Sequence, residues 1–202
     1  MSEPETASVM DGWLDPPRGG RRPGVVNWTL GVDYLTDASS FESAADALVA
    51  GWQRRTDDGL LKPILYLYRH AAELHLKAAI KVANMCVAEP YQDIDRWLRT
   101  PGQGGHSLVA LRDRLLDMLS RPELDAGDPP LGEESLDGRL LLELHELDPR
   151  GDEFRYPSRW DSNAKATIAT GMPGGSDTVG KSVLIDVERM GADLSSLNGH
   201  LG

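Results

Sequence analysis

The sequence contains only one cysteine, Cys86, among 202 residues. A single cysteine excludes an internal disulfide framework and any zinc site made from several cysteines. The chain also lacks the run of roughly 18 apolar residues that a membrane-spanning helix needs. Its N-terminus is acidic and has no basic, apolar signal pattern, beginning MSEPETASVMDGW. From these absences we expect a cytoplasmic protein that does not contact a membrane.

Basic residues are in the minority, since 21 Lys and Arg face 32 Asp and Glu for a net charge of −11. This balance argues against broad, non-specific binding of nucleic acid. The charges are unevenly distributed, however. Residues 61–86 hold four basic residues against one acid, whereas residues 123–148 hold nine acids against one arginine. The basic segment is either a focused anion site or a helix whose lysine stems lie along apolar surface beside a solvated acidic face.

Strand-like alternation is nearly absent, and apolar residues instead recur at spacings of three and four. We therefore predict an all-α bundle of five principal helices, residues 41–202, preceded by a flexible or extended arm, residues 1–40. Ser39 or Ser40 is expected to cap the first helix. A long loop or short hairpin over residues 158–177 precedes the last helix. The predicted helices are 41–55, 60–89, 106–120, 133–147 and 179–197, with a short additional helix at 91–98 that turns Trp97 inward.

Residues 61–86 predict a central, mostly buried helix with a polar line through its apolar body. Arg69, Glu73 and Lys77 recur at i, i+4 and i+8, and His70 lies beside them. Buried charges are costly unless they are paired. The first interpretation is therefore an ion pair between Arg69 and Glu73 that fixes the helix register. The second is that Arg69 holds a phosphate, oriented by Glu73.

Three histidines and one extended segment also have two interpretations each. His70 and His75 are either packed core residues or functional groups of the central helix. His106 opens a helix after a glycine-rich loop, where it either caps and packs locally or reaches the same cleft as the polar line. Arg155 and Tyr156 either pin their loop onto the bundle or complete a phosphate clamp.

Other classes of site have little support in the sequence. The histidines form no HExxH pattern. A P-loop pattern occurs in the segment GSDTVGKS, through Gly175, Gly180, Lys181 and Ser182. A working P-loop needs a buried strand leading into it, and residues 158–174 offer none. We interpret the match as coincidental and predict neither a metal nor a cofactor.

Three motifs in order resemble HEPN-like proteins. They are YRHAAELHLKAAI at 68–80, GHSLVAL at 105–111 and FRYP at 154–157, followed by a last amphipathic helix. The resemblance is closest to a bacterial branch with an RHxxELxLK helix, and it covers roughly residues 41–200. It implies a helical bundle that forms a homodimer and binds RNA or a nucleotide. It also implies a setting in toxin–antitoxin or anti-phage defence.

Active members of the wider family cut RNA without a metal, using an Arg and a His four to six residues apart. Arg69 and His75 have this spacing along the sequence, with five residues between them. On a regular helix, however, the two side chains lie about 120° apart. We therefore take His106 as an equal candidate for proton transfer, since an imidazole titrates near neutral pH.

The predicted roles divide into three groups. Proton transfer falls to His106 or His75, with Arg69 beside them, and Glu73 and His70 orient these groups. The phosphate ligands are expected to be Arg69, Lys77, Arg155 and Tyr156. The alternative function is a non-enzymatic interaction module or antitoxin-like adaptor, in which the polar line is structural and the acidic residues 123–148 bind a protein partner.

Overall fold

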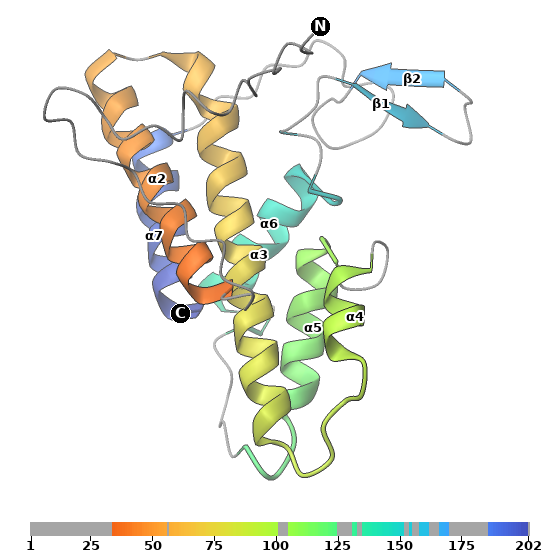
Figure 1. Ribbon diagram of the computed structural model, residues 1–202. Coiled ribbons are helices and arrows are strands. Elements are labelled where there is room, and N and C mark those ends of the chain that lie inside the picture. The colour runs from red at the N-terminus through yellow and green to blue at the C-terminus, as the bar shows by residue number, and fades with distance from the viewer. Residues whose placement is uncertain are drawn as a thin grey trace, which may run out of the picture. The chain divides into compact units, whose positions relative to one another are not determined.

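The computed structural model confirms the all-α class (Figure 1). It describes residues 34–55, 57–100, 105–124, 131–132, 135–151, 154, 158–161, 166–169 and 186–201. The predicted N-terminal arm lies outside these residues up to position 33. Among the described helices, none is long and apolar enough to cross a membrane.

The helices have lengths between 6 and 26 residues. A short 3₁₀ turn, η1, Asp58–Leu60, leads into the longest of them. The α-helices are α2, Tyr34–Arg55; α3, Leu61–Cys86; α4, Ile94–Arg99; α5, Leu108–Leu119; α6, Leu136–Leu147; and α7, Val187–Leu201.

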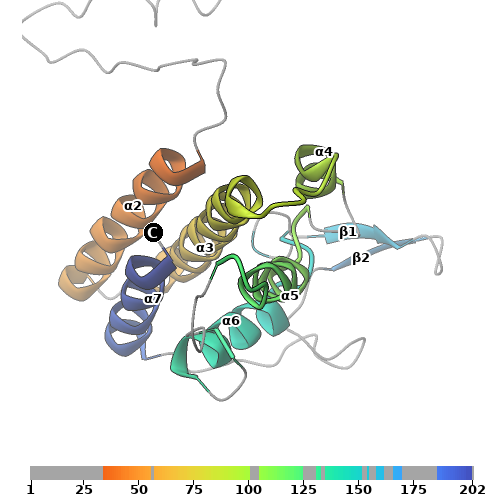
Figure 2. The same ribbon diagram turned by 90° about the horizontal axis from the view of Figure 1, so that it is seen from below.

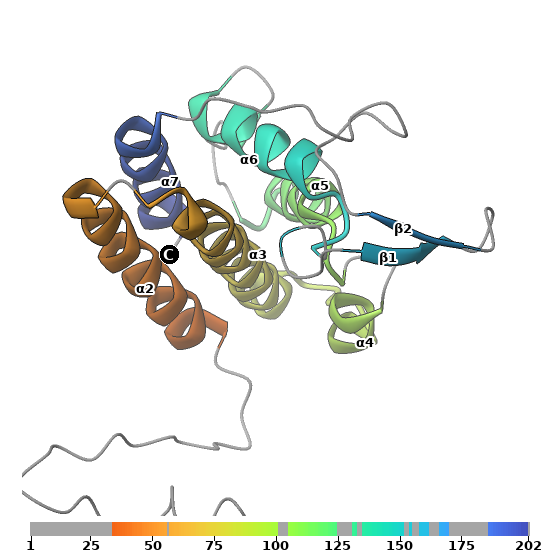
Figure 3. The same cartoon turned by 90° about the horizontal axis from the view of Figure 1, so that it is seen from above.

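Helix α3 is the centre of the bundle. It packs against α2 and α7 on one side and against α5 on the other. Seen along its axis, the order around α3 is α2, α7, α6, α5 and α4 (Figures 2 and 3). Ile64, Leu76 and Ile80 of α3 have no exposed surface. A helix that buries apolar residues on most of its circumference requires neighbours on all of these sides, as the sequence predicted.

Helix α2 begins earlier than predicted, at Tyr34 rather than Phe41. The expected capping by Ser39 or Ser40 is therefore wrong. Both serines lie inside the helix, where their hydroxyls donate to backbone carbonyls one turn back, at 3.1 Å and 2.9 Å. Ala38 is fully buried, so tertiary packing extends the helix beyond the local cap signal.

Other helix ends differ from prediction because serine and aspartate caps lie inside the predicted ranges. Ser107 caps α5 by accepting from the Ala110 N–H at 3.2 Å, so His106 lies before the helix. Ser135 caps α6 in the same way. Asp186 Oδ1 accepts from the Arg189 N–H at 3.0 Å at the start of α7. The rest of the predicted start of this helix, residues 179–185, lies outside the described residues.

The remaining predicted elements agree with the structure in type. Helix α3 ends at Cys86, before Pro90, and Trp97 of α4 packs against the core as expected. Helix α7 continues to Leu201 instead of ending at Leu197, because Leu201 still packs against the core.

A short β-hairpin occupies part of the loop before α7. Strands β1, Ser158–Asp161, and β2, Ala166–Ala169, pair antiparallel with Ser158 opposite Ala169. Of the two alternatives for residues 158–177, a loop or a hairpin, the structure therefore has the hairpin over the residues that it describes.

Candidate functional site

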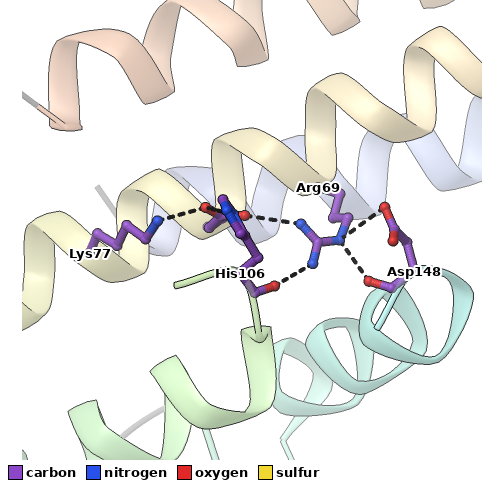
Figure 4. A network of polar contacts seen from close by, with 5 residues as sticks. Arg69, Lys77, His106 and Asp148 are labelled. Carbon is purple, nitrogen blue, oxygen red and sulfur yellow. Dashed lines mark hydrogen bonds and ion pairs between the residues drawn. The ribbon is translucent and has the colours of Figure 1, made fainter. Parts of the chain in front are cut away.

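A buried polar network on α3 is centred on the carboxylate of Glu73, and Figure 4 labels Arg69, Lys77, His106 and Asp148 in it. Its Oε2 accepts a hydrogen bond from Arg69 Nη1 at 3.0 Å. Its Oε1 accepts from Lys77 Nζ at 2.7 Å and lies 3.0 Å from His106 Nδ1. The Glu73 side chain is only 2% exposed. The predicted polar line is therefore real, and the histidine that precedes α5 completes it.

Arg69 ties three parts of the chain together. Its Nε donates to the Asp148 carbonyl at 2.9 Å and lies 3.4 Å from the Asp148 carboxylate, at the end of α6. Its Nη2 donates to the His106 carbonyl before α5. Arg69 is 2% exposed, so in this arrangement its guanidinium presents no surface to an incoming phosphate. Of the two interpretations of Arg69, the ion pair with Glu73 fits this geometry, and the role of a phosphate ligand does not.

Gly151 lies directly against the Arg69 guanidinium. Its φ is +76°, and a Cβ at this position would lie 2.8 Å from Arg69 Nη1. Only glycine adopts this backbone conformation readily and permits so close an approach. The sequence pattern did not single out this glycine. The available signal was the turn Asp148-Pro149-Arg150-Gly151, which directly follows a leucine-rich helix.

The electrostatics of the network keep Glu73 ionised. Burial alone would raise the pKa of this carboxyl. The hydrogen bond from His106, the charge and hydrogen bond of Lys77 and the charge of Arg69 together outweigh burial and lower the pKa to about 2. A fixed negative charge therefore faces the His106 ring at neutral pH.

His106 is the most accessible member of the network. Its side chain is 42% exposed, compared with 7% for Lys77. Its Nδ1 points to Glu73, and in the described part of the chain its Nε2 has no hydrogen-bond partner. A carboxylate that accepts from Nδ1–H fixes the tautomer and leaves a lone pair on Nε2. The arrangement can therefore accept a proton from a group outside the protein.

The structure does not bring His70 and His75 into this network. His75 is 2% exposed and faces α2, with its Nε2 3.6 Å from Glu42 Oε2. Burial lowers the pKa of His75, although Glu42 opposes the shift. The His70 ring lies edge-on to Phe41 at 4.5 Å and stacks with Tyr66 at 5.6 Å. The packing interpretation therefore describes both residues, and the 120° divergence of Arg69 and His75 is consistent with their contacts.

Several predicted residues lie outside the described residues. They include Arg155 and Tyr156 and all four residues of the P-loop pattern, 175–182. Across the residues that the structure does describe, no group of three or more His, Cys, Asp or Glu side chains is arranged to hold a metal ion.

A separate apolar groove of about 490 Å³ lies between α6 and α7. Leu65 of α3 contributes to its lining, with Leu140 and Leu144 from α6 and Met190 and Leu194 from α7. Charged side chains from both helices line it as well, and no member of the Glu73 network takes part. The groove is therefore a different feature of the molecule from the site around His106.

Comparison of the chain with protein-family models, with curated proteins and with solved structures finds no match. The assignment of function therefore depends on the geometry and on the motif resemblance.

We expect Gly151→Ala to destabilise the protein by about 1–3 kcal/mol, because alanine is strained at positive φ and its Cβ meets the Arg69 guanidinium. Gly199→Ala is the control, since nothing lies within 4 Å of a Cβ added there. It should be neutral or slightly stabilising inside α7. Urea unfolding measures both variants, and equal stability of the two would contradict the close approach at Gly151.

Glu73 should make unfolding depend on acid pH. Its pKa in the folded protein is below the ordinary value of 4.5, so its contribution to stability is present above pH 4.5 and is lost as pH falls toward 2. The shift corresponds to roughly 3 kcal/mol. The free energy of unfolding in urea, measured from about pH 5 to about pH 2, should fall less steeply in Glu73→Gln than in wild type.

Asp95→Asn is the matched control for this pH experiment, because Asp95 is 56% exposed and lies outside the Glu73 network. In this variant the free energy of unfolding should fall between about pH 5 and about pH 2 as steeply as it does in wild type. If the free energy of unfolding of Glu73→Gln falls with pH as steeply as that of wild type, the network does not lower the pKa of Glu73.

Proposed function

We propose that this protein is a HEPN-like RNA-binding protein that cleaves RNA without a metal ion, with His106 as the proton-transfer group. One observation carries the proposal: an exposed imidazole has its Nδ1 3.0 Å from a buried, ionised carboxylate. The order of the motifs at 68–80, 105–111 and 154–157 supports the same family and the same helix junction.

The proposed reaction uses the free nitrogen of His106. Nε2 takes the proton of a ribose 2′-hydroxyl, and the 2′-oxygen attacks the adjacent phosphorus. The bond from phosphorus to the 5′-oxygen breaks, a 2′,3′-cyclic phosphate remains, and the leaving 5′-oxygen takes up a proton from water. Glu73 holds the Nδ1–H and stabilises the imidazolium that forms, which is the part that a buried carboxylate plays behind other catalytic histidines.

Arg69 and Lys77 serve this reaction indirectly. Both contact the Glu73 carboxylate, and neither side chain is more than 7% exposed. They are therefore positioning residues that hold Glu73 against His106. The contacts to phosphate are left to other cations, and Arg155 with Tyr156 stays a prediction for that role.

The biological setting follows from the resemblance alone. We propose a cytoplasmic homodimer that acts in a toxin–antitoxin or anti-phage defence system. The acidic net charge of −11 fits binding of RNA at a confined site better than binding along an extended surface.

The second candidate function is a non-enzymatic interaction module or antitoxin-like adaptor. It is favoured by the burial of Arg69, Glu73 and Asp148, whose charges contact one another. Under this function, the sole role of the network is to fix how three helices pack against one another. In this case His106 would be an exposed end of a structural cluster, and RNA would not be cleaved.

The decisive variant is His106→Gln, assayed with single-stranded and structured RNA in the presence of EDTA. Glutamine can still donate to Glu73 but cannot transfer a proton at neutral pH. We expect cleavage to fall by about a hundredfold or more, while the unfolding midpoint changes little.

His200→Gln is the matched control for this assay. His200 is also exposed, at 61%, and its Nδ1 lies 2.9 Å from Asp137 Oδ2, whose side chain is only 9% exposed. It has the same local chemistry at a different place, so its loss should leave cleavage unchanged. Absence of cleavage by the pure wild-type protein would reject the ribonuclease and favour the adaptor. Full activity of His106→Gln would reject His106 as the proton-transfer group.

A further inference from the structure

A second group of cations continues the polar line beyond Lys77. Lys77 and Lys81 are one turn apart on α3, and their Nζ atoms lie 6.0 Å and 5.7 Å from the centre of the Tyr34 ring. Lys77 Nζ and His106 Nδ1 both lie within 3.0 Å of the same oxygen of Glu73. Lys77 therefore links the Glu73–His106 pair to the second lysine beside Tyr34.

Lys77 and Lys81 differ in how accessible they are. The Lys77 side chain is 7% exposed and bound to Glu73, so its charge is used inside the protein. The Lys81 side chain is 34% exposed, and its partner Asp95, at 3.2 Å, is 56% exposed. Ion pairs this exposed are weak, so Lys81 can exchange Asp95 for another anion at small cost.

Arg99 adds a third positive charge from α4. Its Nε donates to the Asp95 carbonyl at 2.9 Å, and within the described part of the chain its Nη groups have no partner. Burial raises the pKa of the Tyr34 hydroxyl. The positive charges of Lys81 and Arg99 oppose this shift, and the carboxylates of Asp95 and Glu73 add to it. Lys81 and Arg99 both contact Asp95, so the two cations lie close together although they come from different helices.

We infer that Lys81 and Arg99 bind a second phosphate of the single-stranded RNA on which His106 acts. The inference rests on the proposed function, because His106 defines the reacting phosphate. Lys81 follows Glu73 by eight residues, so it is displaced from the Glu73–His106 pair by about 12 Å along the axis of α3. A few confined cations in an acidic chain suit the sparse phosphates of one strand better than the two backbones of a duplex.

Tyr34 has a positioning role in this arrangement. Its partly buried ring packs against the core and lies under both lysine ammonium groups. A cation–π contact favours an ammonium over the ring face. The ring therefore holds Lys81 near Lys77, instead of leaving it to extend into solvent.

The test is fluorescence anisotropy with a short, labelled 2′-O-methyl RNA, which binds as a single strand but cannot be cleaved through its 2′-oxygen. We expect Lys81→Ala and Arg99→Ala each to weaken binding by about tenfold, with a salt dependence reduced by about one phosphate contact. Lys81→Arg should retain binding, because arginine also contacts phosphate.

Lys62→Ala is the control, since Lys62 is an exposed lysine in the first turn of the same helix. It should bind the RNA as wild type does. Unfolding midpoints of all variants should stay close to that of wild type, because the pair that Lys81→Ala breaks is exposed.

The outcomes separate this inference from the proposed function. Wild-type binding that is unchanged in both Lys81→Ala and Arg99→Ala overturns the inference and leaves the proposed function standing. Binding that depends on Lys81 and Arg99 in a protein that does not cleave RNA supports the phosphate contact at these two residues and removes the catalytic proposal. A wild-type protein that does not bind the RNA overturns both.

Discussion

The burial of one carboxylate, Glu73, is the constraint on which the rest of this structure depends. A charge removed from water in a helical bundle is stable only if partners surround it. Arg69 and Lys77 supply two of these partners from the same helix, and His106, which directly precedes the cap of α5, supplies the third. Because Arg69 also contacts Asp148, the carboxylate indirectly fixes where α5 begins and where α6 ends.

The same network accounts for the division between buried and exposed groups at the site. Arg69 and Lys77 are inaccessible, so their charges stabilise Glu73 and not a ligand. His106 lies at the edge of the network and keeps one ring nitrogen toward the outside. Proton transfer and phosphate binding would then fall to different residues: His106 for the first, and the accessible cations of α3 and α4 for the second.

The polar line of α3 could be predicted from the local spacing of its residues. Contacts between residues distant in sequence could not be predicted from that spacing. Arg69 and Glu73 are four residues apart, so a helix alone brings them together. His106 is 33 residues from Glu73, and its position depends on how α5 crosses α3, so it could only be a hypothesis. Gly151 was missed because its closeness to Arg69 requires the end of α6 to meet the middle of α3. The start of α2 was misplaced because the packing of Ala38 outweighs the serine cap signal.

The most direct test of the central claim is a double-mutant cycle on the free energy of unfolding, with Arg69→Met and Glu73→Gln. If Glu73 is the buried charge that organises the network, Arg69→Met alone should cost about 3–5 kcal/mol, because it removes one partner of a buried pair. In the Glu73→Gln background the same change should cost at least about 1 kcal/mol less. Additive effects of the two substitutions would contradict the account.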